Sequence, residues 1–314
     1  MSTILTITAN TLLDHVVDLG LTLGAVNRVA RIEPTAGGKG LNVGRVLARH
    51  GHRVIAVGFA GGPSGDQLAD LESAEDMEPA LVPTAARTRI GFMAVDGQQG
   101  GTTTILEGGF AVTAAEIGAL VQRVRGLLAP VDLVIIGGSV PDASCRGLYR
   151  TLLDVCHHAG KPCWVDSYGP AMEEALDGIH PPGLAKPNRQ EYGEKAAHLR
   201  WQICPELHLT DGGKEIRVRH PKGRWRVTPP TVKEVNPIGS GDCYLAALAH
   251  ARLSGMAMTD QLRYAAAAGA ANAARADVAR IAPHEIAALA ERVLVETSEE
   301  DDVKPARRRG SEGK

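Results

Sequence analysis

A glycine-rich turn late in the chain combines an anion-binding backbone with a carboxylate. It reads Asn236-Pro-Ile-Gly-Ser-Gly-Asp-Cys243, and a long apolar helical pattern follows it. The glycines allow the amides of Gly239, Ser240 and Gly241 to point into one cavity, and the helix adds the positive end of its dipole. A carboxylate at Asp242 has two interpretations. It caps the helix, or it removes a proton from a substrate hydroxyl, as a kinase requires.

A second glycine-rich segment, Ala36-Gly-Gly-Lys-Gly-Leu-Asn-Val-Gly44, precedes a helical pattern near the start of the chain. A phosphate-loop motif fails here at Glu33 and Gly40, where it needs a glycine and a serine or threonine. A dinucleotide-binding motif fails at Val43, where its third glycine belongs. The helix start still offers free amides, and Lys39 adds a cationic donor for a polar or anionic ligand. A tight turn with a solvated lysine is the alternative.

The third segment, Lys186-Pro-Asn-Arg-Gln-Glu191, lies where a predicted strand leads into a helix. Pro187 ends the strand, Asn188 can cap the helix, and Glu191 can complete a capping box, which is a purely structural interpretation. The functional interpretation places Asn188 and Glu191 at the carboxyl edge of a sheet, where doubly wound folds bind ligands. There they can order water bound to Mg²⁺ around a nucleotide.

The elements that must position these segments alternate between strands and helices. Apolar strands without alternation, separated by helices, are typical of a parallel sheet covered on both faces. The predicted strands are Ile4–Thr8, Arg53–Gly58, Val131–Ile136, Pro162–Asp166 and Leu184–Lys186. The predicted helices are Leu41–His50, Ala114–Leu128, Ser144–His158, Ala171–Leu176 and Arg189–His198, with three more at about 242–254, 259–275 and 283–295.

Two segments interrupt this alternation. Asp14–Ile32 and Arg87–Leu106 alternate apolar and polar residues with no helix between their strands. Antiparallel strands in a separate small sheet, forming a lid over the main sheet, would explain both. We therefore expect an α/β core from residues 1–10, 33–86 and 107–296, and a β lid from 11–32 and 87–106. The charged stretch 297–314 has few apolar residues and is expected to be disordered.

Composition excludes several classes of function. Lys and Arg total 34 against 36 Asp and Glu, and aromatics make up 4%, so neither phosphate-backbone binding nor base stacking is expected. Five cysteines without a C-x-x-C pair do not predict disulfides or a zinc ribbon. No signal-peptide pattern or apolar run long enough for a membrane helix occurs. We expect a cytoplasmic protein that binds neither nucleic acid nor membrane.

In their order along the chain, the three segments resemble the ribokinase-like (PfkB) family of carbohydrate kinases, over a match from Leu5 to about Leu294. The resemblance implies a three-layer α/β/α sandwich with a mainly parallel sheet and a small β-sheet lid, with ATP and Mg²⁺ as cofactors. It assigns Asp242 as catalytic base, Gly239, Ser240 and Gly241 as anion hole, and Asn188 and Glu191 as groups that bind the metal through water. Thr210-Asp-Gly-Gly213 resembles the nucleotide-side loop, with Thr210, Gly212 and Gly213 as contacts.

Within that family the chain looks most like the phosphosugar branch of fructose-1-phosphate and tagatose-6-phosphate kinases. Asn10-Thr-Leu-Leu-Asp14 stands where that branch has Asn-Pro-Ala-x-Asp. The resemblance implies that Asp14 and Asn42 hold sugar hydroxyls. It makes candidate phosphate ligands of Arg28, Lys39, Arg89 and Ser139, and Gly38 is a further expected substrate-binding residue. A solvated lid residue remains the alternative for each arginine.

The resemblance therefore implies transfer of the γ-phosphoryl group of ATP to a phosphosugar, first of all fructose 1-phosphate, giving fructose 1,6-bisphosphate. Tagatose-6-phosphate and 6-phosphofructokinase activities remain open, as does a kinase of an unphosphorylated sugar or nucleoside. A catalytically silent sugar-phosphate sensor is the rival of a different class. Most departures from the branch pattern, such as Thr11 in place of proline, fall on the sugar side or the lid. A homodimer through the lid is a further expectation.

Overall fold

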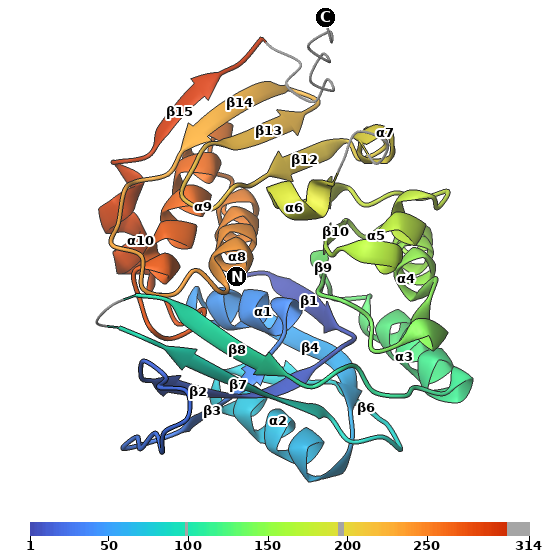
Figure 1. The fold of residues 1–314 in the computed structure, drawn as a ribbon. Helices are drawn as coiled ribbons and strands as arrows, with labels where there is room; N and C mark the ends of the chain where they lie inside the picture. Colours follow the sequence, from blue (N-terminus) through green and yellow to red (C-terminus); the bar gives the residue numbers. More distant parts are fainter. Residues whose placement is uncertain (98–99, 194–197, 300–314) are drawn as a thin grey trace, which may run out of the picture.

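The computed structural model describes residues 1–97, 100–193 and 198–299 of the chain (Figure 1). A long, mainly parallel sheet forms the middle layer, and a smaller sheet lies across one side of it. The predicted α/β architecture with a second, small β-sheet is confirmed.

The main sheet has β1 at its centre, hydrogen-bonded in parallel to β4 on one side and β9 on the other. Along the sheet the order is β15-β14-β13-β12-β11-β10-β9-β1-β4-β5, and β6 also pairs with β4. Every pairing from β5 to β12 is parallel, as the apolar strands with intervening helices predict. The bounds are β1 Thr3–Thr8, β4 Arg53–Ala60, β5 Met77–Pro79, β6 Val82–Pro83, β9 Leu133–Gly137, β10 Cys163–Asp166, β11 Leu184–Ala185 and β12 Glu206–Leu209.

Beyond β12 the sheet continues in antiparallel fashion through β13 (Ile216–His220), β14 (Gly223–Thr228) and β15 (Leu294–Thr297). The prediction of a helix over 283–295 is wrong at its end, because α10 stops at Ala290 and the chain turns back to pair with β14. Backbone groups that a continued helix would bond internally are here bonded to β14. The predicted disordered tail begins at the last residue of β15, and residues 300–314 lie outside the described residues.

Helices cover both faces of the main sheet, so that apolar side chains of β1 enter two separate clusters. Ile4 packs in the cluster of α1, α8, α9 and α10, whereas Leu5 and Ile7 pack in the cluster of α3, α4 and α5. Alternation along a strand places neighbouring side chains on opposite faces, which gives the three-layer sandwich. The bounds are α1 Lys39–Arg49, α3 Ala114–Leu127, α4 Leu148–His158 (after a single 3₁₀ turn, Ala143–Cys145), α5 Gly169–Leu176, α6 Arg189–Tyr192, α7 His198–Trp201, α8 Ser240–Leu253, α9 Met258–Ala273 and α10 Pro283–Ala290.

The small sheet, which we call the lid, has the strand order β3-β2-β7-β8. Its bounds are β2 Leu12–Asp18, β3 Glu33–Gly37, β7 Arg89–Val95 and β8 Thr102–Leu106, and α2 (Gly62–Ala74) packs beneath β2 and β3. Two expectations need correction. The sequence assigns 33–37 to the core, but these residues pair with β2. The central pair β2–β7 is parallel rather than antiparallel, because the two strands come from separate segments and no hairpin joins them.

Candidate active site

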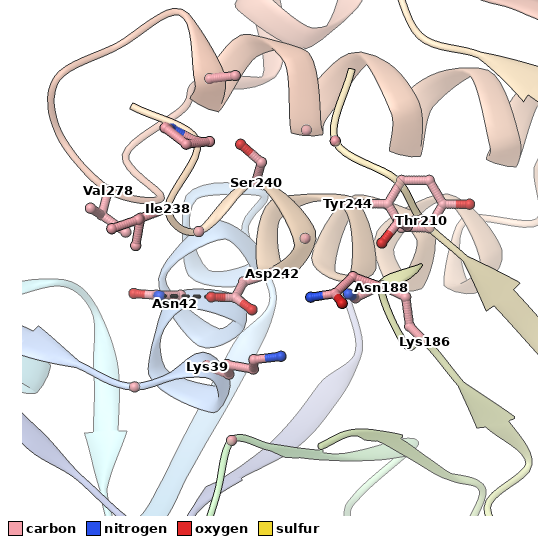
Figure 2. Close-up of a pocket in the computed structure, with 18 of the residues that line it drawn as sticks. Lys39, Asn42, Lys186, Asn188, Thr210, Ile238, Ser240, Asp242, Tyr244 and Val278 are labelled. Carbon is pink, nitrogen blue, oxygen red and sulfur yellow. Dashed lines mark hydrogen bonds between the residues drawn. The ribbon is translucent and has the colours of Figure 1, made fainter. Parts of the chain in front are cut away.

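A cavity of about 620 Å³ lies between the lid, the carboxyl ends of the central parallel strands and the start of α8 (Figure 2). Parallel strands expose their carboxyl ends at one edge, so segments far apart in sequence meet there. The predicted site residues that line this cavity are Asp14, Gly38, Lys39, Asn42, Arg89, Ser139, Asn188, Glu191, Thr210, Gly212, Gly213, Gly239, Ser240, Gly241 and Asp242. Arg28 does not line it; this side chain is exposed in the connection between β2 and β3.

The residues of the predicted anion hole lie at the start of α8. Gly239 has φ +84°, and a Cβ there would lie 2.7 Å from the Val278 side chain, so glycine is required. The Ser240 amide donates to the carbonyl of Pro237 at 3.1 Å and is not free for a ligand. The amides of Gly241 and Asp242 have no intrahelical acceptor at these first-turn positions. These two amides therefore remain available to an anion, together with the helix dipole.

Asp242 is buried at this helix start and accepts a 2.7 Å hydrogen bond from the Asn42 side-chain amide (Figure 2). Burial and the nearby Asp166 carboxylate raise the pKa of Asp242 to about 6, although Lys39, Asn42 and Lys186 pull it down. A carboxyl with this pKa is ionised at neutral pH and holds a proton more readily than an ordinary Asp. Those are the properties of a general base.

Two lysines meet on one buried carboxylate next to Asp242. Lys39 Nζ lies 2.9 Å from an oxygen of Asp166 and 2.9 Å from one of Glu191, and Lys186 Nζ lies 3.0 Å from the other Asp166 oxygen. Burial by itself lowers the pKa of Lys39, but the carboxylates of Asp166, Asp242 and Glu191 outweigh it and raise the pKa. Burial likewise raises the pKa of Asp166, and Lys186 and Lys39 reverse that shift. Lys39 and Asp166 are therefore both charged.

Asn188 and Glu191 form the predicted capping box at the start of α6. The Asn188 side chain accepts from the Glu191 backbone amide at 2.8 Å, and the Glu191 carboxylate accepts from the Asn188 backbone amide at 2.9 Å. The other oxygen of Glu191 accepts from Lys39. Thr210 lies beside this turn through an isolated β-bridge with Asn188. The structural interpretation of this segment is thus confirmed, and both side chains still line the cavity.

The lid contributes Asp14 and Arg89 to the opposite wall. Burial raises the pKa of Asp14, and hydrogen bonding from the His15 amide and the charges of His15 and Arg89 offset only part of this. Burial lowers the pKa of Arg89, whose hydrogen bonds go to backbone carbonyls. Ser139 accepts a 3.0 Å hydrogen bond from the Asn10 side-chain amide on the same wall. The lid wall of the cavity therefore carries both an acidic group, Asp14, and a basic group, Arg89.

Residues 7–285 match the pfkB family of carbohydrate kinases. The chain belongs to this family. It is an ATP-dependent sugar kinase. Among solved structures, a provisionally assigned 1-phosphofructokinase from Thermotoga maritima superposes with a TM-score of 0.84 at 21% identity, covering 95% of this chain and 100% of that one. Phosphofructokinase-2 from Escherichia coli, in complex with fructose-6-phosphate, gives 0.80 at 23%, covering 93% and 99%.

A provisionally assigned phosphofructokinase from Staphylococcus aureus is 25% identical, with a TM-score of 0.77 and coverage of 94% of this chain and 99% of that one.

Two residues of the present chain that lie at the site, Asp166 and Lys186, are not among the residues predicted from the sequence. Both had a usable signal, because Asp166 ends one predicted strand and Lys186 ends the next along the sheet. Carboxyl ends of neighbouring parallel strands meet at one edge.

Among the described residues of this kinase, no group of three or more His, Cys, Asp or Glu side chains is arranged to hold a metal ion directly. Glu191 has both carboxylate oxygens engaged by protein donors. The same described part of the chain contains no helix of the length and apolarity needed to cross a membrane.

Proposed function

We propose that this kinase transfers the γ-phosphoryl group of ATP to a phosphosugar, with fructose 1-phosphate as the first candidate acceptor and fructose 1,6-bisphosphate as product. The observation that carries this proposal is the set of hydrogen-bond partners around the Arg89 guanidinium. Its side chain is half-buried at the cavity, and its hydrogen bonds go to the carbonyls of Asn10, Thr11 and Glu107, at 3.3–3.4 Å.

Arg89 and Lys39 differ in how their charges are balanced. Lys39 already has two carboxylates at 2.9 Å, so a phosphate would have to compete with them. Arg89 makes no ion pair within the described residues, and its long hydrogen bonds to neutral carbonyls compensate its charge weakly. A phosphate group on the acceptor would supply the missing negative charge, and guanidinium binds phosphate in a bidentate manner. We therefore assign the acceptor phosphate to Arg89 and a sugar hydroxyl to Asp14.

Asp242 then acts as general base. It takes the proton of the acceptor hydroxyl, the resulting oxygen attacks the γ-phosphorus, and the bond from that phosphorus to the bridging oxygen of ADP breaks. The amides of Gly241 and Asp242 and the positive end of α8 stabilise the charge that develops on the transferring group. The ammonium of Lys186 lies 2.8 Å from where a Cβ on Gly241 would be, so it adds positive charge beside these amides.

Mg²⁺ fits this site only as an ion held through its own waters. Asn188 and Glu191 offer oxygens that already accept one protein hydrogen bond each but have further lone pairs. Mg²⁺ keeps several waters when it accompanies nucleotide phosphates, where it neutralises their charge. We propose that Asn188 and Glu191 accept hydrogen bonds from those waters, and that Thr210, Gly212 and Gly213 contact the nucleotide.

Activity on fructose 6-phosphate is the second candidate, and the similarity to the Escherichia coli phosphofructokinase-2 complex favours it. In the proposed complexes of fructose 1-phosphate and fructose 6-phosphate, the phosphate of the acceptor contacts Arg89. The two complexes differ in which end of the sugar reaches Asp242. A panel of fructose 1-phosphate, fructose 6-phosphate, tagatose 6-phosphate, fructose and ribose, each with ATP, separates these candidates by kcat/KM.

The proposal predicts a selective effect of Arg89→Ala. We expect KM for the phosphosugar to rise roughly 10- to 100-fold, because a charge-assisted hydrogen-bonded pair contributes about 1.5–3 kcal/mol. The KM for ATP and the low turnover of unphosphorylated fructose should change little. Arg87→Ala is the matched control, since Arg87 lies two residues away, is 54% exposed and pairs with Glu107 outside the cavity. An unchanged KM for the phosphosugar in Arg89→Ala would contradict the proposal.

We also propose that the outer edge of the lid contacts a second copy of the chain. Ile105 is 63% exposed on the edge strand β8, and its side chain does not line the cavity, whereas that of the neighbouring Leu106 does. Apolar side chains on an edge strand are a typical dimer contact. Sedimentation of the protein should give a dimer, and Ile105→Glu should shift the population to monomer at micromolar concentration. A wild-type protein that sediments as a monomer throughout this range would contradict the idea.

A further inference from the structure

One arginine behind the active site has no exposed surface at all. Arg45 lies on α1, one turn after Asn42, and every nitrogen of its guanidinium is engaged. Nε donates to the Glu75 carboxylate, Nη1 donates to Oδ1 of Asn42 at 2.8 Å, and Nη2 donates to the carbonyl of Ala36 at 2.6 Å. Burying a charge of this kind is unfavourable unless its partners are fixed, so the guanidinium is held in one orientation.

That orientation decides which way the Asn42 amide faces. An asparagine side chain has an acceptor oxygen and a donor NH₂ group that can exchange places by rotation. Because Arg45 donates to Oδ1, the NH₂ group must lie on the other side, where it donates to Asp242 Oδ2 at 2.7 Å (Figure 2). With the amide reversed, its oxygen would face the Asp242 carboxylate, which is a repulsive contact. Arg45 excludes this arrangement.

Arg45 is itself anchored by elements that border the lid. Glu75 caps the end of α2 and is held a second time by Arg280, from the connection between α9 and α10, at 2.7 Å. Ala36 belongs to the lid strand β3, and Arg280 also reaches Thr35 of that strand at 3.5 Å. The lid, α2, α1 and the α9–α10 connection are therefore joined through a single buried guanidinium and its partners.

We infer that Arg45 is a positioning residue for phosphoryl transfer: through Asn42 it fixes the hydrogen bond to Asp242, and through Ala36 it links that bond to lid strand β3. This inference rests on the role of Asp242 as general base in the proposed function. Arg45 does not touch substrate, because it does not line the cavity. Its contribution is the direction of one donor, and an error of about 1 Å in such a group can cost roughly 10²-fold in rate.

The first variant chosen to test this inference keeps a buried positive charge. Glu72 is fully buried near Arg45 with both carboxylate oxygens lacking hydrogen-bond partners, and burial raises its pKa to about 8 even though Arg45 opposes this. Removing the guanidinium outright would leave Glu75 and Arg280 rearranged around an empty space. Arg45→Lys keeps the charge beside Glu75 but has a single ammonium, which cannot bond Glu75, Asn42 and Ala36 together.

We expect Arg45→Lys to lower kcat roughly 10- to 100-fold, with KM for ATP within about twofold of wild type. Arg49→Lys is the matched control, because Arg49 lies one turn further on α1 and makes its hydrogen bond to the backbone carbonyl of Arg280 at 3.4 Å rather than to Asn42, Glu75 or Ala36; it should keep the wild-type kcat. The pH profile gives a second readout. The Asn42 hydrogen bond lowers the pKa of Asp242, so its loss should move the acidic limb of kcat to higher pH. The charged groups Lys39, Asp166 and Lys186, which also face Asp242, are unchanged in this variant.

A double-mutant cycle separates positioning from general destabilisation. If Arg45 acts through Asp242, adding Arg45→Lys to Asp242→Asn should cost less than about twofold further in kcat, whereas independent effects would multiply. Wild-type kcat and an unmoved acidic limb in Arg45→Lys would overturn the inference, as would a fully multiplicative cycle. If Arg45→Lys does not fold, Arg45→Met combined with Glu75→Gln removes both charges, and the same criteria apply. Should Asp242→Asn alone retain wild-type turnover, the proposed function fails instead, whatever Arg45→Lys does.

Discussion

Asp242→Asn should lower kcat about 10²- to 10⁴-fold, the range that general-base catalysis contributes. The substituted side chain is almost the same shape, can still accept the hydrogen bond from Asn42 and keeps the first turn of α8 intact. What it cannot do is take a proton from the acceptor hydroxyl. The KM for ATP should change little, because Thr210, Gly212 and Gly213, which we propose contact the nucleotide, are untouched. A steady-state assay of ADP release measures both parameters.

The same substitution should make the protein more stable. The folded-state pKa of Asp242 is raised to about 6 from an ordinary value near ~4, so at neutral pH the folded state carries an unfavourable charge. The resulting destabilisation of the folded state is absent below pH ~4, grows as pH rises to about 6, and is constant above that pH. The amide that replaces the carboxylate in Asp242→Asn has no charge, and we expect about 2 kcal/mol more unfolding free energy at pH ~7.5 and none at pH ~4.

Asp260→Asn is the control for both measurements, because Asp260 is 58% exposed on α9 and pairs with Arg263 on the same helix. It should leave kcat and stability close to wild type. An Asp242→Asn protein with kcat within a fewfold of wild type would contradict the assignment of the base. Lower stability than wild type at neutral pH would contradict the account of its raised pKa.

Asp166→Asn should lower the unfolding free energy by about 3–5 kcal/mol, the usual cost of removing one member of a buried ion pair. The side chains of Asp166 and Lys186 are 1% and 3% exposed, and Lys186 has no second carboxylate within ion-pair distance in the described residues. Lys39 also loses a partner, although Glu191 remains. Urea denaturation at neutral pH should show a lower midpoint with an unchanged slope.

The difference in unfolding free energy between wild type and Asp166→Asn should depend on pH in one direction. The pKa of Asp166 is lowered in the folded state, so its stabilising contribution is present above the unfolded pKa of ~3.9 and is lost as pH falls through the folded value. The gap between wild type and Asp166→Asn should therefore narrow toward pH ~3. Asp154→Asn, which removes a carboxylate 42% exposed beside His180, should cost less than about 1 kcal/mol. Equal losses in the two variants would contradict the buried-pair account.

Local chemistry makes part of this structure predictable. Thr113 and Glu116 have the Thr-x-x-Glu spacing that is typical of a capping box. They form one at the start of α3, where the Thr113 backbone amide donates to the Glu116 carboxylate at 2.7 Å. The Asn188–Glu191 box likewise appears where the sequence places it. Apolar strands between helices correctly predict a parallel sheet, because burial on both faces needs apolar residues at every position.

Other parts of the structure depend on contacts between residues far apart in the sequence, which a local pattern does not indicate. Lys39 and Asp166 are 127 residues apart, and nothing near either residue identifies the other. Helix α2 is not predicted because it begins Gly62-Pro63-Ser64-Gly65, a run of residues typical of turns. The proline in its first turn is common at helix starts but does not by itself identify a helix. Strand β3 joins the lid because its backbone pairs with β2, which its own five residues do not indicate.

Arg28 shows the same limit for the site. A basic residue in the β2–β3 connection matches the phosphosugar branch by position, yet its side chain is exposed and outside the cavity within this single chain. Arg89 differs because β7 pairs with β2 in a register that sets Arg89 opposite Leu12 at the start of the lid. Strand register, rather than residue type, decides which arginine reaches the cavity.

The most direct test of the central claim is kcat/KM of the wild-type enzyme for fructose 1-phosphate and for fructose, measured with ATP by ADP release. The account predicts that the phosphorylated sugar is the better acceptor by at least roughly 10-fold, since Arg89 supplies a phosphate contact that fructose cannot use. This advantage should disappear in Arg89→Ala and persist in Arg87→Ala. An enzyme that turns over fructose or ribose as efficiently as any sugar phosphate in the panel would contradict it.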